Sequence, residues 1–353
     1  MKRFQCACGA HLFFDNVSCL SCGREVGWCP GCQNMTALEP LPEGGYRCGH
    51  ADCGAILLKC RNYAEEGVCN RMVPVGADQA APALCDCCRY NAVIPDLSID
   101  GHRQRWAELE AAKRRLFYTL DLLGLPRGGE AEGFEPPLSF SFMADALPDA
   151  GLWRGTGKGE KVYTGHAEGH ITINIKETDA VERERLRTDL NESHRTLIGH
   201  FRHEIGHYYW EVLVRGRDEA RCRPVFGDHD HPSYAEALER YYEQGAPADW
   251  RSNFISAYAT MHPWEDFAET FAFYLDIASV QDTALHFGLG GGGYTDNLDD
   301  MLRSFSWVGL VVNEINRDMG LIDLVPEIIT PAIRNKLDYL HALVRGGRRR
   351  AAR

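Results

Sequence analysis

Long apolar runs are missing from this chain of 353 residues, and so is an excess of positive charge. No stretch approaches the roughly eighteen consecutive apolar residues of a membrane span, so we expect no membrane segment. The net charge of −12 at pH 7 argues against a general nucleic-acid binder, because contacts to phosphates need a basic surface. Asp15 and Asn16 interrupt the segment after Met1-Lys2-Arg3, so we find no signal peptide and expect a cytoplasmic protein.

Cysteine is nearly absent from the last three quarters of the chain. Thirteen of the fourteen cysteines lie before residue 89, and only Cys222 falls later. A disulfide framework would need a secretory signal, whereas in a reducing cytosol clustered cysteines indicate metal sites. The length allows two domains, and the hydrophobic fraction of 44% is ordinary for a soluble protein. We therefore expect a cysteine-rich region over residues 1–97 and a second domain over residues 98–353.

Twelve of the early cysteines sort by spacing into three sets of four. The first set has two short knuckles about a dozen residues apart, which is typical of a zinc ribbon, and Gly9 and Gly23 let backbone amides turn toward the thiolates. Closed sets of four cysteines suit structural zinc, whose binding would largely drive the folding of so small a region. The sets are Cys6, Cys8, Cys19 and Cys22; Cys29, Cys32, Cys48 and Cys53; and Cys60, Cys69, Cys85 and Cys88.

The ligands of the later sets have competitors. His50 could replace Cys48 or Cys53, Cys87 competes with its neighbours in "CDCC", and the sets could interleave. Free buried thiols or an iron–sulfur cluster would also fit the spacing. Residues 1–100 carry eight Lys/Arg and eleven Asp/Glu, a net of −3, which weakens a nucleic-acid role and favours a protein partner or packing against the second domain.

The sequence pattern predicts that the second domain is mainly helical with a small sheet. Apolar residues recur at helical spacing over residues 102–123, while "LSFSFM" (138–143) and "HITINI" (170–175) alternate as strands do. After about residue 181 the pattern is mostly helical, and the tail over residues 345–353 carries five arginines, which favours a disordered end. The fold class is therefore α+β.

The segment "RTLIGHFRHEIGHYYW" contains a His-Glu-x-x-His motif. On a helix His203 and His207 lie about one turn apart and can converge on one metal ion, with Glu204 beside them. Phe201 and Ile205 fit a buried helix. An ordinary helix with satisfied histidines is the alternative, so the interpretation depends on a third ligand. His200, His229 and His231 lie outside the motif; a second metal site at the last two is the minor reading.

A later helix offers the third ligand. A metzincin would place Gly and His where this chain has Trp210 and Leu213, which excludes that class. In the gluzincin arrangement a Glu on a later helix binds the zinc, and an acid four residues on orients a ligand histidine. The segment "HPWEDFAETFAFYLDI" (262–277) has Glu265 and Glu269 at that spacing; Asp266 or His229 would come next if Glu265 failed.

The segment "YATMHPWEDFAETF" resembles the third-ligand region of lethal-factor-type gluzincins. The resemblance implies that Glu265 is the ligand, Glu269 its outer partner, and Tyr258 the phenol near the scissile carbonyl. The chain as a whole is similar to a bacterial family of zinc-binding metallopeptidases, provisionally called Mx, which joins an N-terminal zinc-ribbon region to such a motif. That similarity implies a zincin-like domain over residues 98–353.

The resemblance implies a reaction. Zinc would activate a water and polarise a peptide carbonyl, Glu204 would move the proton, and Tyr258 would donate to the oxyanion. We expect one catalytic and up to three structural zinc ions, with a peptide or protein as substrate. In zincins the place of residues 170–175 belongs to an edge strand that pairs with the substrate. The alternatives are a zinc-ribbon adaptor with an inactive domain and a hydrolase of small amides.

Overall fold

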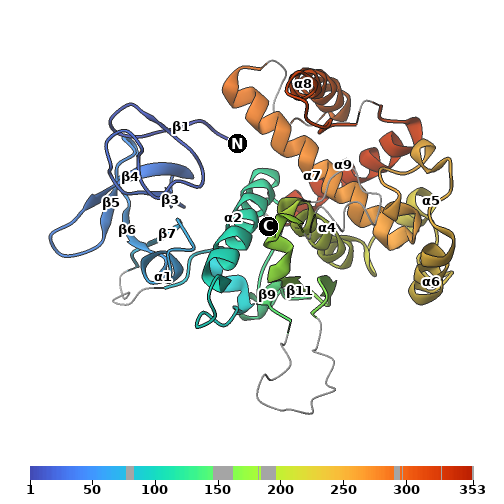
Figure 1. The fold of residues 1–353 in the computed structure, drawn as a ribbon, viewed down its shortest axis with the longest axis horizontal. Helices are drawn as coiled ribbons and strands as arrows, with labels where there is room; N and C mark the ends of the chain where they lie inside the picture. The colour runs from blue at the N-terminus through green and yellow to red at the C-terminus, as the bar shows by residue number, and fades with distance from the viewer. Residues whose placement is uncertain are drawn as a thin grey trace, which may run out of the picture. The chain divides into compact units, whose positions relative to one another are not determined.

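Short β-strands shape the beginning of the chain in the computed structural model (Figure 1). Strands β1 (Phe4–Gln5) and β2 (His11–Leu12) pair antiparallel. A second antiparallel sheet follows in chain order, and its strands are β3 (Val26–Cys29), β4 (Asn34–Pro40), β5 (Tyr46–Cys48), β6 (Ile56–Lys59) and β7 (Met72–Pro74). The short helix α1 (Arg61–Ala64), the 3₁₀ turn η1 (Cys88–Tyr90) and strand β8 (Asn91–Val93) complete this part.

Each knuckle of the first cysteine set turns at a glycine. Gly9 and Gly23 have φ values of 89° and 72°, a region that glycine enters without steric penalty. Their amides donate to the carbonyl oxygens of Cys6 and Cys19, each at 2.8 Å. Beside them Trp28 meets the rings of two buried phenylalanines edge-on, so aromatic packing supports a region too small for a large core.

The chain divides into two units, Met1–Arg114 and Arg115–Arg353, and the division falls inside helix α2 (His102–Leu123). The helix has the bounds that its apolar spacing predicts, while the domain boundary expected at residue 97 stays a prediction. The structure describes residues 1–76, 83–145, 162–181, 183, 196–289, 295, 297–326 and 328–351.

A small sheet in the second unit corrects one expectation. Strand β11 (His170–Asn174) lies between β10 (Gly165–Ala167), to which it is antiparallel, and β9 (Ser139–Met143), to which it is parallel. The strand predicted over residues 170–175 therefore exists, but the prediction that it is an edge strand is wrong. Its Ile171 and Ile173 are buried, as expected of an inner strand, and β10 occupies the edge instead.

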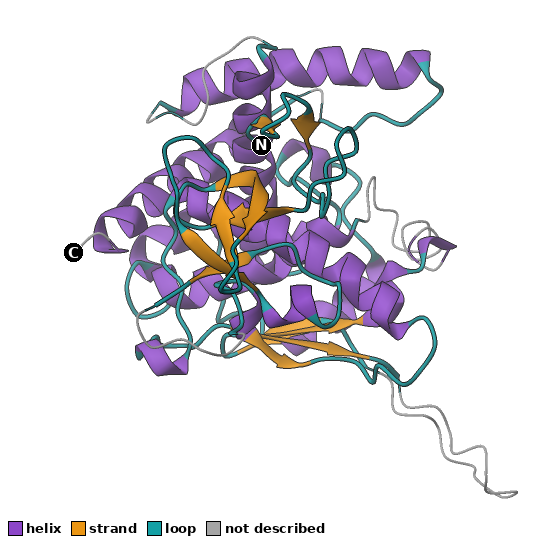
Figure 2. Ribbon diagram, turned by 90° about the vertical axis from the view of Figure 1, so that its left-hand side faces the viewer, coloured by secondary structure: helices purple, strands orange, loops and turns teal. Residues whose placement is uncertain are grey.

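Helices make up most of the remaining second unit, and Figure 2 shows how far they outweigh the strands. Helix α7 packs along α4, and α8 and α9 pack on α7. The longer helices are α4 (Leu197–Tyr209), continued by a π-helical turn η4 (Trp210–Val214), α5 (Glu219–Phe226), α6 (Tyr234–Gln244), α7 (Pro263–Phe287), α8 (Leu298–Asp318) and α9 (Pro331–Ala351). The 3₁₀ turns are η2 (Glu130–Glu132), η3 (Ile175–Thr178), η5 (Trp250–Ser252) and η6 (Tyr258–Thr260).

These elements confirm the predicted fold class, a cysteine-rich sheet region followed by a mainly helical part with a small sheet. The arginine-rich tail differs from the expected disorder, because helix α9 continues through Ala351; residues 352–353 lie outside the described residues. Within the described part of the chain, none of the helices combines the length and the apolar character that crossing a bilayer requires.

Candidate functional site

Helix α4 presents the histidine motif from a well-anchored start. Thr196 caps the helix, accepting a hydrogen bond from the amide of Gly199 at 3.0 Å. Phe201 and Ile205 are buried and fix the helix in the core. The two motif histidines then lie one turn apart on the side that meets α7.

Helix α7 begins immediately before the predicted third ligand. The side chain of His262 caps it by accepting from the amide of Trp264 at 3.1 Å, and Pro263 occupies the first turn, where its missing N–H is no loss. Glu265 lies in this first turn and Glu269 one turn later. His262, which the sequence leaves without a role, is therefore explained by capping.

A glycine lets the two helices approach closely. A Cβ added to Gly206 would lie 2.9 Å from the Cα of Ala268 and 3.0 Å from its carbonyl oxygen. Such distances are too short for any side chain, so only glycine permits this crossing. Gly206 lies between His203 and His207 along the helix. Its close approach to Ala268 therefore sets the distance from the two histidines to Glu265.

Three ligand atoms converge at this crossing. Glu265 Oε2 lies 3.1 Å from His203 Nε2 and 3.4 Å from His207 Nε2, and the two Nε2 atoms are 3.1 Å apart. Nitrogen and oxygen ligands about 2.0–2.1 Å from a tetrahedral zinc are about 3.3 Å from each other. The observed triangle thus has the size of a zinc site.

The charges at this triangle also fit a cation. Glu265 Oε2 is buried and accepts no hydrogen bond within the described chain, which is an unfavourable state for a carboxylate oxygen without an ion. Burial would raise the pKa of Glu265, but His207 and His203 outweigh it and hold the pKa well below its usual range. The residues present therefore suit a divalent metal with three protein ligands and an open position.

Glu269 orients the first histidine. Its Oε1 is 2.5 Å from His203 Nδ1, which leaves Nε2 directed at the triangle. Burial acts to raise the pKa of Glu269, but hydrogen bonds from His203 and Ser256 lower it, so the carboxylate is ionised. A carboxylate behind a ligand histidine fixes the ring and increases its basicity.

Glu204 has the environment of a proton acceptor. The side chain is buried beside the two histidines. Burial raises the pKa of Glu204, although His203 and His207 act in the opposite direction. A carboxylate with a raised pKa takes up a proton more readily, which is the property that a general base needs.

Tyr258 lies close to the triangle at the start of η6. Its ring centre is 6.1 Å from that of His203 and 5.8 Å from that of Tyr241. Burial raises the pKa of Tyr258 well above its usual range, and the nearby carboxylate of Glu265 adds to this effect. The phenol therefore stays neutral and can donate a hydrogen bond.

Several neighbours of the triangle were not predicted from the sequence. Tyr234 donates a hydrogen bond to Glu265 Oε1 at 2.9 Å from a position 31 residues away. The ring of Trp264 lies 4.2 Å from that of His207. His166, on the edge strand β10, stacks 6.1 Å from His207, and burial lowers its pKa to about 3. Of these three residues, only Trp264 could have been found from the sequence, because it directly precedes Glu265.

The other candidate side chains lie elsewhere. His200 Nδ1 is 3.1 Å from Glu177, and Asp266 pairs with Lys336 at 2.6 Å. The ring of His229 packs on Trp210. Among the described residues, neither His229 nor His231 joins a set of converging ligand atoms.

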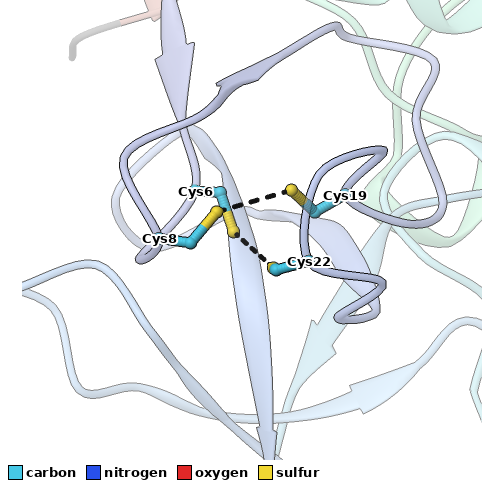
Figure 3. A group of neighbouring side chains, drawn as sticks. All are labelled: Cys6, Cys8, Cys19 and Cys22. Carbon is cyan, nitrogen blue, oxygen red and sulfur yellow. Dashed lines mark hydrogen bonds between the residues drawn. The ribbon is translucent and has the colours of Figure 1, made fainter.

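The structure brings each predicted set of cysteines together (Figure 3 for the first set). Four sulfurs about 2.3 Å from a tetrahedral zinc are about 3.8 Å apart, a separation far longer than the S–S bond of a disulfide. The neighbouring sulfurs are 3.7 Å apart for Cys6–Cys22 and Cys8–Cys19, 3.8 Å for Cys29–Cys53, 3.7 Å for Cys32–Cys48 and 3.9 Å for Cys69–Cys85.

The cysteine sets differ in exposure. In the first set Cys8 and Cys22 are exposed, whereas all four cysteines of the third set are buried. Amides of Cys22 and Ser21 lower the pKa of Cys19 to about 6, which favours the thiolate that binds zinc. The competitors His50 and Cys87 are not part of the converging sets, although Cys87 is buried.

Both parts of the chain match known families. Residues 102–343 match the model of a family described as "putative zinc-binding metallo-peptidase", and residues 3–99 match a zinc-ribbon domain. Uncharacterized proteins of Mycobacterium bovis and of two strains of Mycobacterium tuberculosis are each 36% identical over 358 residues, which spans 98% of this chain and 95% of the relative. No solved structure matches.

Proposed function

Because this chain belongs to the family described as "putative zinc-binding metallo-peptidase", we propose that it hydrolyses peptide bonds with a zinc ion held by His203, His207 and Glu265. The observation that carries the proposal is the triangle of ligand atoms, with sides of 3.1–3.4 Å, beside the buried carboxylate of Glu204. Its three ligands leave the open position that catalysis needs.

Each residue of the site has a role in this proposal. Zinc, when bound, supplies Lewis acidity that lowers the pKa of a water and polarises the substrate carbonyl. Glu204 accepts the proton of the attacking water and passes it to the leaving amine. Tyr258 donates a hydrogen bond to the developing oxyanion. Glu269 keeps His203 in the required orientation.

We propose a peptide or protein as the substrate. Strand β10 is the edge of the small sheet, and its His166 packs next to His207. An extended peptide that adds to this edge would run past the zinc ligands, so β10 takes the role first expected of residues 170–175. We also propose that residues 258–269 act as the corresponding segment of lethal-factor-type gluzincins does. The positions of Tyr258, Glu265 and Glu269 around His203 support this.

The cysteine sets are proposed as three structural zinc sites, one zinc for each. Tetrahedral spacing of the sulfurs supports zinc, and four ligands leave no open position for chemistry. With a net charge of −3 over residues 1–100, the cysteine-rich region is better suited to binding a protein partner than a nucleic acid. Thiolate zinc sites also suit a reducing compartment, so we keep the cytoplasm as the proposed location.

The variant Glu204→Gln tests the peptidase. It removes the base and no ligand, so we expect full zinc content and a loss of turnover of about 10²–10⁴-fold on a peptide library. A parallel panel of small non-peptide amides separates the classes: cleavage of these amides alone would replace the peptidase by an amidohydrolase. Failure of the zinc-loaded wild-type chain to cleave either panel would favour a zinc-ribbon adaptor with an inactive domain.

A further inference from the structure

Tyr234 has a fixed position at the first residue of α6. The preceding Ser233 forms a capping box with Glu236: its hydroxyl accepts from the Glu236 amide at 3.4 Å, and the Glu236 carboxylate accepts from the Ser233 amide at 3.0 Å. The ring packs edge-on against Trp264 and His262, with ring centres 5.8 and 5.4 Å away. Cap and rings together aim the hydroxyl at the start of α7.

The hydroxyl of Tyr234 meets the oxygen of Glu265 that does not face the histidines. It donates to Oε1 at 2.9 Å, while Oε2 lies 3.1 and 3.4 Å from the two Nε2 atoms. The two oxygens of one carboxylate are thus divided between a phenol and the metal position. A carboxylate free at both oxygens can bind a metal through one or both of them.

We propose that Tyr234 is a positioning residue that restricts Glu265 to one-oxygen ligation and thereby keeps the fourth coordination position open. With Oε1 held by the phenol, the carboxylate cannot rotate to bring both oxygens to the ion. The same hydrogen bond withdraws negative charge from the carboxylate, which leaves a bound ion a stronger Lewis acid. The inference rests on the zinc-binding half of the proposed function and does not require peptide hydrolysis.

The helix that carries Tyr234 also contacts Tyr258. Tyr241, seven residues further along α6, contacts the ring of Tyr258 at 5.8 Å. Helix α6 therefore fixes both the ligand and the oxyanion donor from one face.

The variant Tyr234→Phe tests the assignment in the full chain. A moderate chelator strips the zinc of the histidine site, the cysteine sets keep theirs, and zinc is titrated back against a chromophoric competitor. His203→Ala gives the background from zinc held by cysteine. We expect Tyr234→Phe to bind this zinc about 10-fold more tightly than the wild type, because the second oxygen of Glu265 becomes free to bind and no hydrogen bond draws charge from the carboxylate. Cobalt(II) in the same site reports ligand number by its visible absorption, which we expect to weaken as the second oxygen of Glu265 binds.

Controls separate this role from simple packing. Tyr242→Phe removes a hydroxyl from the same helix at a side chain that is 69% exposed, and both readouts should stay at the wild-type values. The melting temperature of the stripped protein should not change in Tyr234→Phe, because the proposed role concerns the bound ion. Unchanged zinc affinity with an unchanged cobalt spectrum would overturn the proposal, as would weaker zinc binding by Tyr234→Phe. An inactive wild type with normal zinc affinity would refute only the peptidase.

Discussion

The two units of this chain assemble metal ligands in different ways. In the first unit, twelve sulfurs form closed sets of four on short strands and knuckles, in a region with little core of its own. In the second unit, two nitrogens and one oxygen meet where helices α4 and α7 cross, and extensive helix packing holds them. A closed set of four sulfurs leaves no position for a substrate, whereas a set of three ligands leaves one and here lies beside the buried carboxylate of Glu204. We therefore propose that metal builds the fold in one unit and serves the chemistry in the other.

The largest expected effect comes from breaking a closed, buried set. Cys60→Ser removes one of four buried sulfurs, and binding of a structural zinc is worth about 10–16 kcal/mol in apparent free energy. We expect this variant to lose one zinc and the strands of the first unit, as measured by elemental analysis and limited proteolysis. Cys8→Ser, in the set with two exposed cysteines, should lose its zinc but keep the sheet β3–β7. Equal damage from the two variants would contradict the distinction.

The oxyanion donor sharpens the contrast from the catalytic side. Tyr258→Phe removes one hydroxyl near the open position, and we expect turnover to fall about 10²–10³-fold, or about 2.7–4 kcal/mol of transition-state stabilisation. Zinc content and melting temperature should remain those of the wild type. A tyrosine that only packs would instead leave the rate unchanged or reduce it in step with stability.

The outer carboxylate should have a smaller effect than the ligand. Glu265→Ala removes an oxygen that faces both histidines and should weaken the zinc itself. Glu269→Ala removes only the partner of His203 Nδ1 and should lower zinc affinity about 10–100-fold. Chelator competition ranks the two variants; full zinc occupancy and activity in Glu265→Ala would mean that the third ligand lies elsewhere.

The smallest expected effect concerns the helix crossing. Gly206→Ala places a methyl group against the backbone of Ala268, and overpacking of this kind typically lowers stability by about 1–3 kcal/mol. Because the helices must move apart, zinc affinity should fall as well. Gly346→Ala is the matched control, since open space surrounds that position on α9, and it should be neutral or slightly stabilising. If both variants melt alike, the close crossing has no energetic role.

Local spacing allowed the sequence to predict much of this site. A helix alone brings His203 and His207 together at i,i+4, and a short turn alone brings together the cysteines of a Cys-x-x-Cys pair. Both patterns can therefore be recognised without knowledge of the fold. Glu265 and Glu269 have the i,i+4 spacing of a helix as well, but their roles were implied by the resemblance to lethal-factor-type gluzincins. The cysteine groupings that the structure brings together are those that the spacing predicts.

Other features depend on tertiary structure that spacing does not encode. The order β10–β11–β9 puts a later strand between two earlier ones, and no pattern in "HITINI" reveals its neighbours. The contact of Tyr234 with Glu265 joins α6 to α7 across 31 residues. Composition suggested a disordered tail after residue 345, where helical propensity and the preceding helix α9 instead continue the helix through Ala351.

Zinc content per chain, measured together with peptide turnover, tests the central claim most directly. The wild-type chain purified without chelator should contain four zinc ions, and the double variant His203→Ala/His207→Ala should contain three and have no peptidase activity. Because the cysteine sets are untouched, the missing ion can only come from the site at the crossing of α4 and α7. An equal zinc content in both proteins, or full turnover by the double variant, would contradict the account.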